Sequence, residues 1–235
     1  MPKIPLFEEL TTGPIPRGSN LLVVFDPASV WYNAALTISM GWLQTGGGVH
    51  YNASIQSPDA VRTQLTHLGF TPEDLEKEDK LRIYDFYSAT LGRKSDDKHA
   101  VHSLKVHELS PEYATWLKND ELGENVNTLR VIENGSTLAR YNDEKILAEF
   151  ILTRVFPRSP LWKATLIASV VHGLHTDWFY KALESSADGV IDFKLDETHD
   201  PPQNLIRIRS LRNARFDGRW HTLQVAENFE VTIVN

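Results

Sequence analysis

The sequence of 235 residues contains no cysteine. A disulfide framework, a catalytic thiolate and a cysteine-bound zinc or iron–sulfur centre are therefore excluded. No apolar run approaches the roughly 18 residues that a membrane-spanning helix needs, which argues against an integral membrane protein. Positive charge is scarce as well, because 24 lysines and arginines stand against 31 aspartates and glutamates. A chain with a net charge of −7 is not expected to coat nucleic acid nonspecifically.

The start of the sequence, Met1 to Pro5, also lacks the apolar stretch of a secretory signal. We therefore expect a cytoplasmic protein with no membrane partner. With 41% hydrophobic and 23% charged residues, the composition is ordinary for a globular protein. There is no internal repeat or low-complexity tract, so we expect a single domain over residues 1–235.

Short apolar runs typical of buried strands alternate with segments that have the spacing of helices. The strands are expected at 21–25, 49–54, 81–86, 129–132 and 164–171, and the helices at 28–43, 58–68, 110–117, 142–155 and 176–185. The helix at 58–68 should start at Ser57-Pro58 and end at Gly69, and Pro157 and Pro160 should end the one at 142–155. Such alternation predicts an α/β fold with a mostly parallel sheet covered by helices on both faces.

The last fifty residues have a different pattern. Four strand-like segments, 189–195, 204–211, 220–225 and 229–234, are joined by loops too short for crossover helices. We expect antiparallel strands that extend one edge of the sheet at its C-terminal end.

Three segments carry a family resemblance, and they occur in family order. They are Ile15 to Val24, Tyr51 to Gly69, and Ala187 to Ile191 followed by Leu205 to Arg212. The chain resembles KaiC-like proteins of the RecA ATPase superfamily, a group that includes archaeal-type RadA paralogues. The resemblance implies a RecA-like P-loop NTPase core, with a phosphate loop between the first strand and the first helix.

The residues of that loop depart from the signature G-x-x-x-x-G-K-[ST]. The chain reads Phe25, Asp26, Pro27, Ala28, Ser29, Val30, Trp31 and Tyr32. On the resemblance, the glycine positions hold Phe25, Ala28 and Val30, the lysine position holds Trp31, and the Mg²⁺-binding hydroxyl position holds Tyr32. This implies a degenerate Walker A motif, in which Asp26 also places negative charge where phosphate would lie.

Other catalytic positions of the family are altered too. Its acidic pair after the second strand falls on Ile55 and Gln56, and its Walker B aspartate falls on Glu133. Its late Lys-x-Arg falls on Ser210 and Arg212. Joint loss of these parts of phosphoryl-transfer machinery predicts a protein without ATPase activity, catalytic residues or a nucleotide cofactor.

Other constellations support no activity of their own. The histidine pairs His99/His102 and His172/His175 have a spacing that could bind metal, but no further ligand motif accompanies them, so we expect no metal. Ser136 and Ser159 lack the Gly-x-Ser-x-Gly context of a serine hydrolase. Glu133 and Asp192 could meet at the carboxyl edge of the sheet, either for acid–base work or as remnants of a metal site. We favour the remnant.

A basic stripe remains near the C-terminus of this acidic chain, made of Arg207, Arg209, Arg212, Arg215 and Arg219. Arg207 and Arg209 should point to one face of a strand, because side chains alternate. A charged edge strand that resists aggregation is the simpler interpretation. The alternative is an interface for an acidic neighbour or nucleic acid.

The main hypothesis is a pseudo-ATPase that acts as a regulatory or scaffolding subunit. Its partner would be a second copy of itself or a paralogous RecA/KaiC-like protein, because proteins of this family commonly assemble side by side. Arg212 should then lie near a subunit boundary. One alternative is a nucleic-acid-associated recombination or repair modulator that uses the arginines, although nucleic acid is not favoured. The other is an enzyme with an unrecognised site around Glu133.

The altered loop also predicts a local structure. Asp26 and Pro27 are favoured residues for an N-cap and a first helical position, so we expect the helix to begin near Pro27. The Asp26 carboxylate should accept a hydrogen bond from the N–H of Ala28 or Ser29. Ser29 is the rival N-cap, and Trp31 or Tyr32 should fill space that nucleotide would need.

Overall fold

A nine-stranded sheet with the order β3-β2-β4-β5-β1-β6-β7-β8-β9 organises the molecule. The structure is a computed structural model that describes residues 4–109 and 127–234, and the helix expected at 110–117 lies outside these ranges. The strands are β1 (Asn20–Phe25), β2 (Gly48–Ala53), β3 (Leu81–Asp85), β4 (Thr128–Ile132), β5 (Thr165–Val171), β6 (Gly189–Asp196), β7 (Gln203–Leu211), β8 (His221–Val225) and β9 (Val231–Val234). Every strand that the sequence predicts is present.

The sheet is parallel from β3 to β6, and the pairs β6–β7, β7–β8 and β8–β9 are antiparallel. This confirms the expected α/β class, with antiparallel strands at the C-terminal edge. It also corrects the interpretation of the arginine-bearing strand as an edge strand. β7 is an interior strand, because β8 and β9 continue the sheet beyond it.

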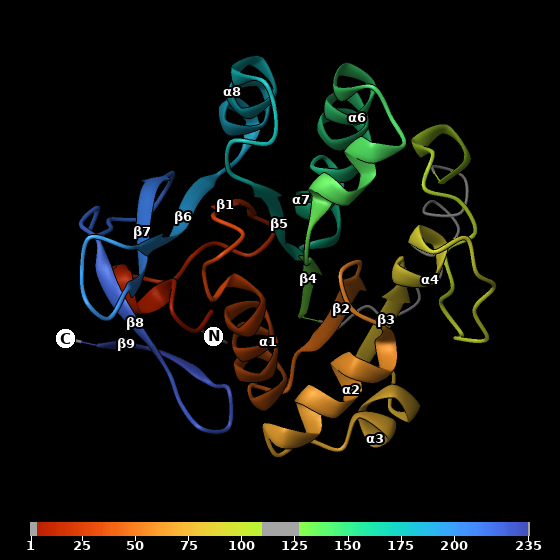
Figure 1. The fold of residues 1–235 in the computed structure, drawn as a ribbon, viewed down its shortest axis with the longest axis horizontal. Coiled ribbons are helices and arrows are strands. Elements are labelled where there is room, and N and C mark those ends of the chain that lie inside the picture. The colour runs from red at the N-terminus through yellow and green to blue at the C-terminus, as the bar shows by residue number, and fades with distance from the viewer. Residues whose placement is uncertain (1–3, 110–126, 235) are drawn as a thin grey trace.

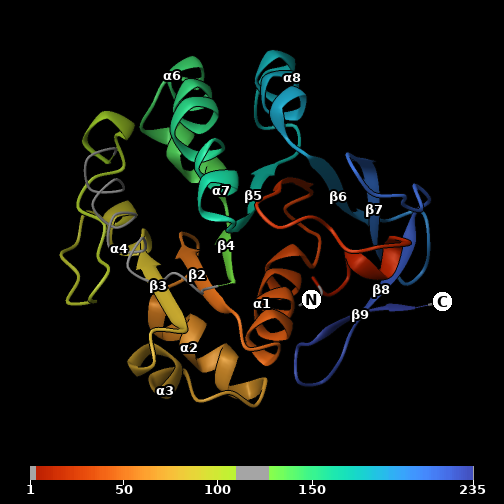
Figure 2. The same ribbon diagram turned by 180° about the vertical axis from the view of Figure 1, so that it is seen from behind.

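Helices cover both faces of the sheet. They are α1 (Trp31–Gln44), α2 (Pro58–His67), α3 (Pro72–Lys77), α4 (Tyr87–Thr90), α6 (Glu144–Phe150), α7 (Arg158–Trp162) and α8 (Asp177–Ser186). Two 3₁₀ segments lie at Glu8–Leu10 (η1) and Gly135–Arg140 (η2), and a π-helical turn spans Ile151–Val155 (η3). Figure 1 shows α6 and α8 on one side of the sheet and α1, α2 and α3 on the other, and Figure 2 shows the same two layers from behind.

The central strand β1 is apolar at successive positions because both of its faces are buried. Leu21, Val23 and Phe25 pack into the cluster on the α1 side, whereas Leu22 and Val24 pack into the cluster on the α8 side. A strand covered on both faces needs apolar residues at every position. All six residues of β1 are buried.

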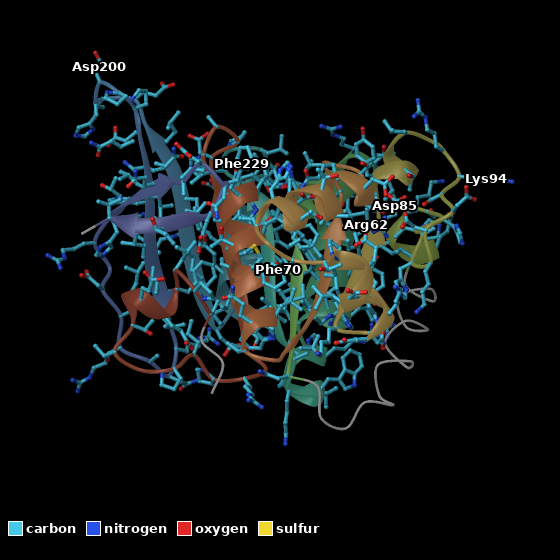
Figure 3. The ribbon with its side chains drawn as sticks, turned by 90° about the horizontal axis from the view of Figure 1, so that it is seen from below. Arg62, Phe70, Asp85, Lys94, Asp200 and Phe229 are labelled. Carbon is cyan, nitrogen blue, oxygen red and sulfur yellow. The ribbon has the colours of Figure 1, made fainter. Side chains whose placement is uncertain are left out.

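Helix boundaries follow local chemistry in most places. Ser57 caps α2 by accepting a hydrogen bond from the Ala60 N–H at 3.2 Å, and Pro58 is the first helical residue. Gly69 follows with a φ of +90°, a left-handed conformation that suits glycine after a helix end. Arg62, labelled in Figure 3, ties α2 to α3 through Glu76 at 2.9 Å and to the loop after α4 through Asp97 at 2.6 Å.

The helix expected over 142–155 is divided. α6 ends at Phe150, and the chain continues as a π-helical turn in which the Phe156 N–H bonds to the Ile151 carbonyl. Pro157 has no N–H with which to extend the ladder. Pro160, expected to lie beyond the helix, is instead within α7, near its start, where a missing N–H costs nothing.

The outer strand β9 is protected on its free side. Its first residue, Val231, is 1% exposed, and its N–H donates to the Thr37 hydroxyl of α1 at 2.9 Å. This contact ties the start of β9 to α1 and occupies one N–H that would otherwise be open to edge-to-edge pairing.

Candidate functional site

The segment between β1 and α1 forms consecutive turns rather than the start of a helix. The Asp26 carboxylate accepts the Ala28 N–H at 2.9 Å, as expected, but the Asp26 carbonyl also accepts the Ser29 N–H and the Ser29 hydroxyl. Asp26 thus closes a turn on itself, a common use of aspartate. The expectation that the helix begins near Pro27 is wrong, because α1 begins at Trp31.

The rival N-cap is wrong as well. Ser29 donates its hydroxyl backwards to Asp26, and the residue before the helix is Val30, whose side chain cannot cap. The Val30 N–H is instead satisfied from far away in the sequence, by the Asn204 side-chain oxygen of β7 at 2.9 Å. No residue from 26 to 32 has the positive φ that a glycine-rich loop can use.

The Trp31 side chain points into the core and contacts residues of neighbouring strands. Its side chain is fully buried, and its indole N–H donates to the Glu133 carbonyl at 2.9 Å and to the Ser169 hydroxyl at 3.1 Å. Its ring packs against Phe193 with 5.1 Å between centroids. Trp31 therefore links the start of α1 to the end of β4, to β5 and to β6.

Tyr32 makes a second link to the end of β4. Its hydroxyl accepts a hydrogen bond from the Asn134 amide at 3.0 Å, and its ring lies edge-on to Phe25. Burial raises the pKa of Tyr32, so the side chain is a neutral phenol at physiological pH.

Glu133 lies directly after β4 and is completely buried. One carboxylate oxygen accepts the backbone N–H groups of Ser54 at 2.7 Å and Ile55 at 3.0 Å. The other accepts the Tyr51 hydroxyl at 3.2 Å and the Gln56 amide at 3.3 Å. Burial raises the pKa of Glu133, while these hydrogen bonds oppose the shift by favouring the charged form. Its acceptor capacity is filled by donors from β2 and the segment after it.

Glu133 and Asp192, considered together from the sequence, are not neighbours. Glu133 follows β4 and Asp192 lies on β6, and β5 and β1 separate these two strands in the sheet. Asp192 instead accepts hydrogen bonds from Arg207 Nε at 2.8 Å and Arg209 Nη2 at 3.1 Å. These two arginines therefore share one face of β7, as predicted.

Arg212, Arg215 and Arg219 make up the rest of the stripe. Arg212 donates to the Ser185 carbonyl at the C-terminal end of α8, at 2.7 Å, and Arg219 pairs with Asp217 at 2.7 Å. Arg215 is exposed. Arg212 therefore contacts the α8 residue next to Glu184, the partner of Arg209, whereas Arg219 is engaged by the segment between β7 and β8.

Sequence reasoning missed a polar network around His175. Its Nε2 is 2.7 Å from the Ser136 hydroxyl and its Nδ1 is 2.9 Å from Glu144 Oε1, the order of groups found in a serine hydrolase. However, Ser136 is only 2% exposed, and its hydroxyl accepts the Val171 N–H. The network therefore fastens the short segment between β5 and α8. No motif could have revealed it, because its members are 8 to 39 residues apart.

One histidine of each pair has identified partners in the structure. His99 packs its ring against Tyr84, with 5.2 Å between centroids, and burial lowers its pKa to about 4. His175 is engaged by Ser136 and Glu144, and both His172 and His175 line an open groove beside α8. Within residues 4–109 and 127–234, no three histidine, aspartate or glutamate side chains are arranged to hold a metal ion. None of the described helices is long and apolar enough to cross a membrane.

Comparison with known proteins places these observations in context. No protein-family model matches the sequence. The chain is 26% identical over 231 residues to the UPF0273 protein SSO1861 of Saccharolobus solfataricus, a match that covers 96% of this chain and 79% of that protein. Its fold is similar to the crystal structure of the KaiC-like protein PH0186 from the hyperthermophilic archaeon Pyrococcus horikoshii OT3, with a TM-score of 0.76 and 18% identity, covering 100% of this chain and 97% of that one. The chain thus has the RecA-type fold of a KaiC-like protein.

Proposed function

We propose that this protein is a pseudo-ATPase, a KaiC-like fold with a degenerate Walker A motif that serves as a regulatory or scaffolding subunit. The observation that carries the proposal is the closure around Glu133. This residue is at the family's Mg²⁺-binding position, yet it is 0% exposed and is bound by Ile55 and Gln56, the residues at the positions of the family's acidic pair. The groups that would prepare and position an attacking water are engaged with one another.

The phosphate side of the site supports the same proposal. A bound triphosphate needs a lysine and open backbone N–H groups that can approach it closely. Here Trp31 donates its only polar hydrogen to Glu133 and Ser169, and the Asn204 amide oxygen takes the Val30 N–H. The Asp26 carboxylate adds a negative charge beside this turn, which repels phosphate.

The direct test is calorimetric titration of the protein with ATP and ADP in the presence of Mg²⁺, together with a phosphate-release assay. We expect no saturable binding up to about 1 mM nucleotide, an affinity no better than roughly −4 kcal/mol, and no hydrolysis above the blank. Micromolar affinity that is lost when Trp31 or Tyr32 is substituted would overturn the proposal.

Asp26→Ala provides a second test. It removes the acceptor of the Ala28 N–H and should lower stability by about 1 kcal/mol, measured by denaturant unfolding. It should leave nucleotide binding and hydrolysis unchanged, because we expect none. Loss of a measurable hydrolysis rate in this variant would show that the loop is catalytic.

The scaffolding role is tested by light scattering of the purified chain at several protein and salt concentrations. We expect an oligomer that high salt loosens, with Arg212 near the boundary between copies. Because Arg212 also holds the end of α8, Arg215→Ala is the better first variant. A monomer at every concentration, combined with no paralogous partner co-purifying from the native cell, would count against this role.

A further inference from the structure

A groove of about 700 Å³ runs between α8 and the strands β6 and β7. It lies on the face of the sheet opposite α1, at the carboxyl ends of β1 and β5. The connection from β1 leads through α1 to β2 on one side, and the connection from β5 leads through α8 to β6 on the other. In open α/β sheets, ligands bind in the crevice where connections diverge in this way.

The floor of the groove is built in register. Phe25 is paired with Val171 and with Phe193, so the residues that follow them, Asp26, His172 and Lys194, stand in one row across β1, β5 and β6. The His172 N–H bonds to the Phe25 carbonyl and the Asp26 N–H to the Phe193 carbonyl, which continues the ladder past the strand end. All three residues line the groove.

Part of the groove is lined by cationic side chains that are held by carboxylates, and Lys194 Nζ lies 3.7 Å from Asp196 Oδ2. The Asp192 side chain is 12% exposed, and it holds Arg207 and Arg209, which are 34% and 37% exposed. Glu184 holds Arg209 from α8 at 2.8 Å. A carboxylate that binds one side of a guanidinium group fixes the orientation of that group. The N–H groups of the guanidinium that the carboxylate does not bind remain able to donate to a ligand.

Trp220 completes this part of the groove. The Arg207 guanidinium lies 4.4 Å from the Trp220 ring centre, and Lys194 Nζ lies 4.7 Å from it. Arg207 donates only its Nε to Asp192, so within the described ranges its two terminal nitrogens have no hydrogen-bond partner. A planar fork held on an aromatic face is suited to bidentate contact with an oxyanion.

The groove is also lined by acidic side chains. Asp26 lies on its floor beside His172, and Asp177 is the first residue of α8. Lys181, one turn along α8, lines it as well. The groove therefore offers both signs of charge, with the arginines on β7 and the two aspartates after β1 and at the start of α8.

We propose that this groove binds a small molecule that carries an oxyanion, either a carboxylate or a phosphate, against Arg207 and Lys194. Another part of the ligand would present hydrogen-bond donors or a positive charge to Asp26 and Asp177. This site shares Asp26 with the turn in front of α1, but its oxyanion contacts lie on β6 and β7, and the inference does not depend on the pseudo-ATPase proposal. Its volume is within the range of ordinary small-molecule pockets.

The experiment is calorimetric titration of the full chain with three probes in the absence of nucleotide: glutarate, L-glutamate and inorganic phosphate. Glutarate and phosphate distinguish the two oxyanion sources, and L-glutamate adds an ammonium group that Asp26 and Asp177 can accept. We expect saturable binding of at least one probe below about 10 mM, with L-glutamate tighter than glutarate. Arg207→Met should weaken that binding at least tenfold, since a charge-assisted bidentate contact is lost.

Arg219→Met is the matched control, because Arg219 is exposed, pairs with Asp217 and does not line the groove. It should leave binding unchanged. Asp26→Asn should weaken L-glutamate but not glutarate. If Arg207→Met fails to fold, Lys194→Met tests the same part of the groove, since its aliphatic stem can remain against Trp220.

Three results would overturn the inference. The first is the absence of saturable binding by all three probes. The second is equal loss of binding in Arg207→Met and Arg219→Met, which would indicate nonspecific charge. The third is tight, salt-dependent binding of a single-stranded oligonucleotide that each of these arginine variants weakens to the same degree, which would indicate a dispersed nucleic-acid surface.

Discussion

Replacing Glu133 by glutamine and by alanine separates the charge of this carboxylate from its hydrogen bonds. In Glu133→Ala, the buried N–H groups of Ser54 and Ile55 lose their acceptor. Each such loss costs about 1–3 kcal/mol, and the vacated volume adds to it. We therefore expect the alanine variant to lose at least about 3 kcal/mol of unfolding free energy, a large share of the stability of an ordinary domain.

Glutamine should be tolerated far better. Its oxygen can accept the same two backbone N–H groups, and its NH₂ can face the Tyr51 hydroxyl and the Gln56 amide, which can each turn to accept. Since glutamine carries no charge, the desolvation that raises the pKa of Glu133 is absent. Near neutral pH we expect Glu133→Gln to be within about 1 kcal/mol of the wild type, or more stable.

The pH dependence has a definite sign. The folded protein holds the Glu133 proton more tightly than the unfolded chain does, because the folded pKa is raised. Between the ordinary glutamate pKa of about 4.3 and the folded value, the native state binds more protons, so this group's contribution to stability decreases as pH rises. A tenfold difference in proton affinity between the folded and unfolded states corresponds to about 1.4 kcal/mol of unfolding free energy.

The assay is urea unfolding of the wild type, both variants and the exposed control Glu149→Gln at a series of pH values from about 5 to 8. The unfolding free energy of the wild type minus that of Glu133→Gln should fall across the part of this series that lies below the folded pKa. Glu149→Gln changes an exposed side chain and should keep the wild-type unfolding free energy to within about 0.5 kcal/mol. A glutamine variant as damaged as the alanine variant, or a difference that rises with pH, would refute the reasoning.

Two further predictions concern buried side chains at the same edge of the sheet. Trp31→Phe loses the indole N–H bonds and part of the ring volume, and should cost about 1–3 kcal/mol, whereas Trp31→Ala should cost about 3–5 kcal/mol; equal denaturation midpoints for the two variants would contradict this. Ser136→Ala removes the hydroxyl that binds the Val171 N–H and His175 Nε2, and should lower the unfolding free energy by about 1–3 kcal/mol. The wild-type protein should not be labelled by a fluorophosphonate, because Ser136 is sealed from solvent; labelling that Ser136→Ala abolishes would show a reactive serine.

The strand and helix pattern was predictable because its signals are local. The apolar run of β1, the Ser57–Pro58 start of α2 and the Gly69 stop each depend on residues a few positions apart. The antiparallel C-terminal strands followed from the short loops between them. The fold class was accessible for the same reason.

The start of α1 was missed, since its decisive contact is not local. Aspartate followed by proline is a favoured helix start, but Asp26 can also close a turn with Ala28 and Ser29. Asn204, 174 positions away in the sequence, then supplies the acceptor for the Val30 N–H. No local pattern distinguishes these two uses of the same aspartate.

The sequence by itself determines that no G-x-x-x-x-G-K-[ST] signature is present, because that signature requires particular residue types at fixed spacing. How the side chains near the ends of the strands are used depends on how the chain folds. Trp31 reaches Glu133 and Ser169, Gln56 reaches Glu133, and Arg207 lies on Trp220, all through contacts between segments that are distant in sequence. Strand order and register decide which polar groups form hydrogen bonds with one another. The strand order in turn depends on burying both faces of the whole sheet, and no single segment determines it.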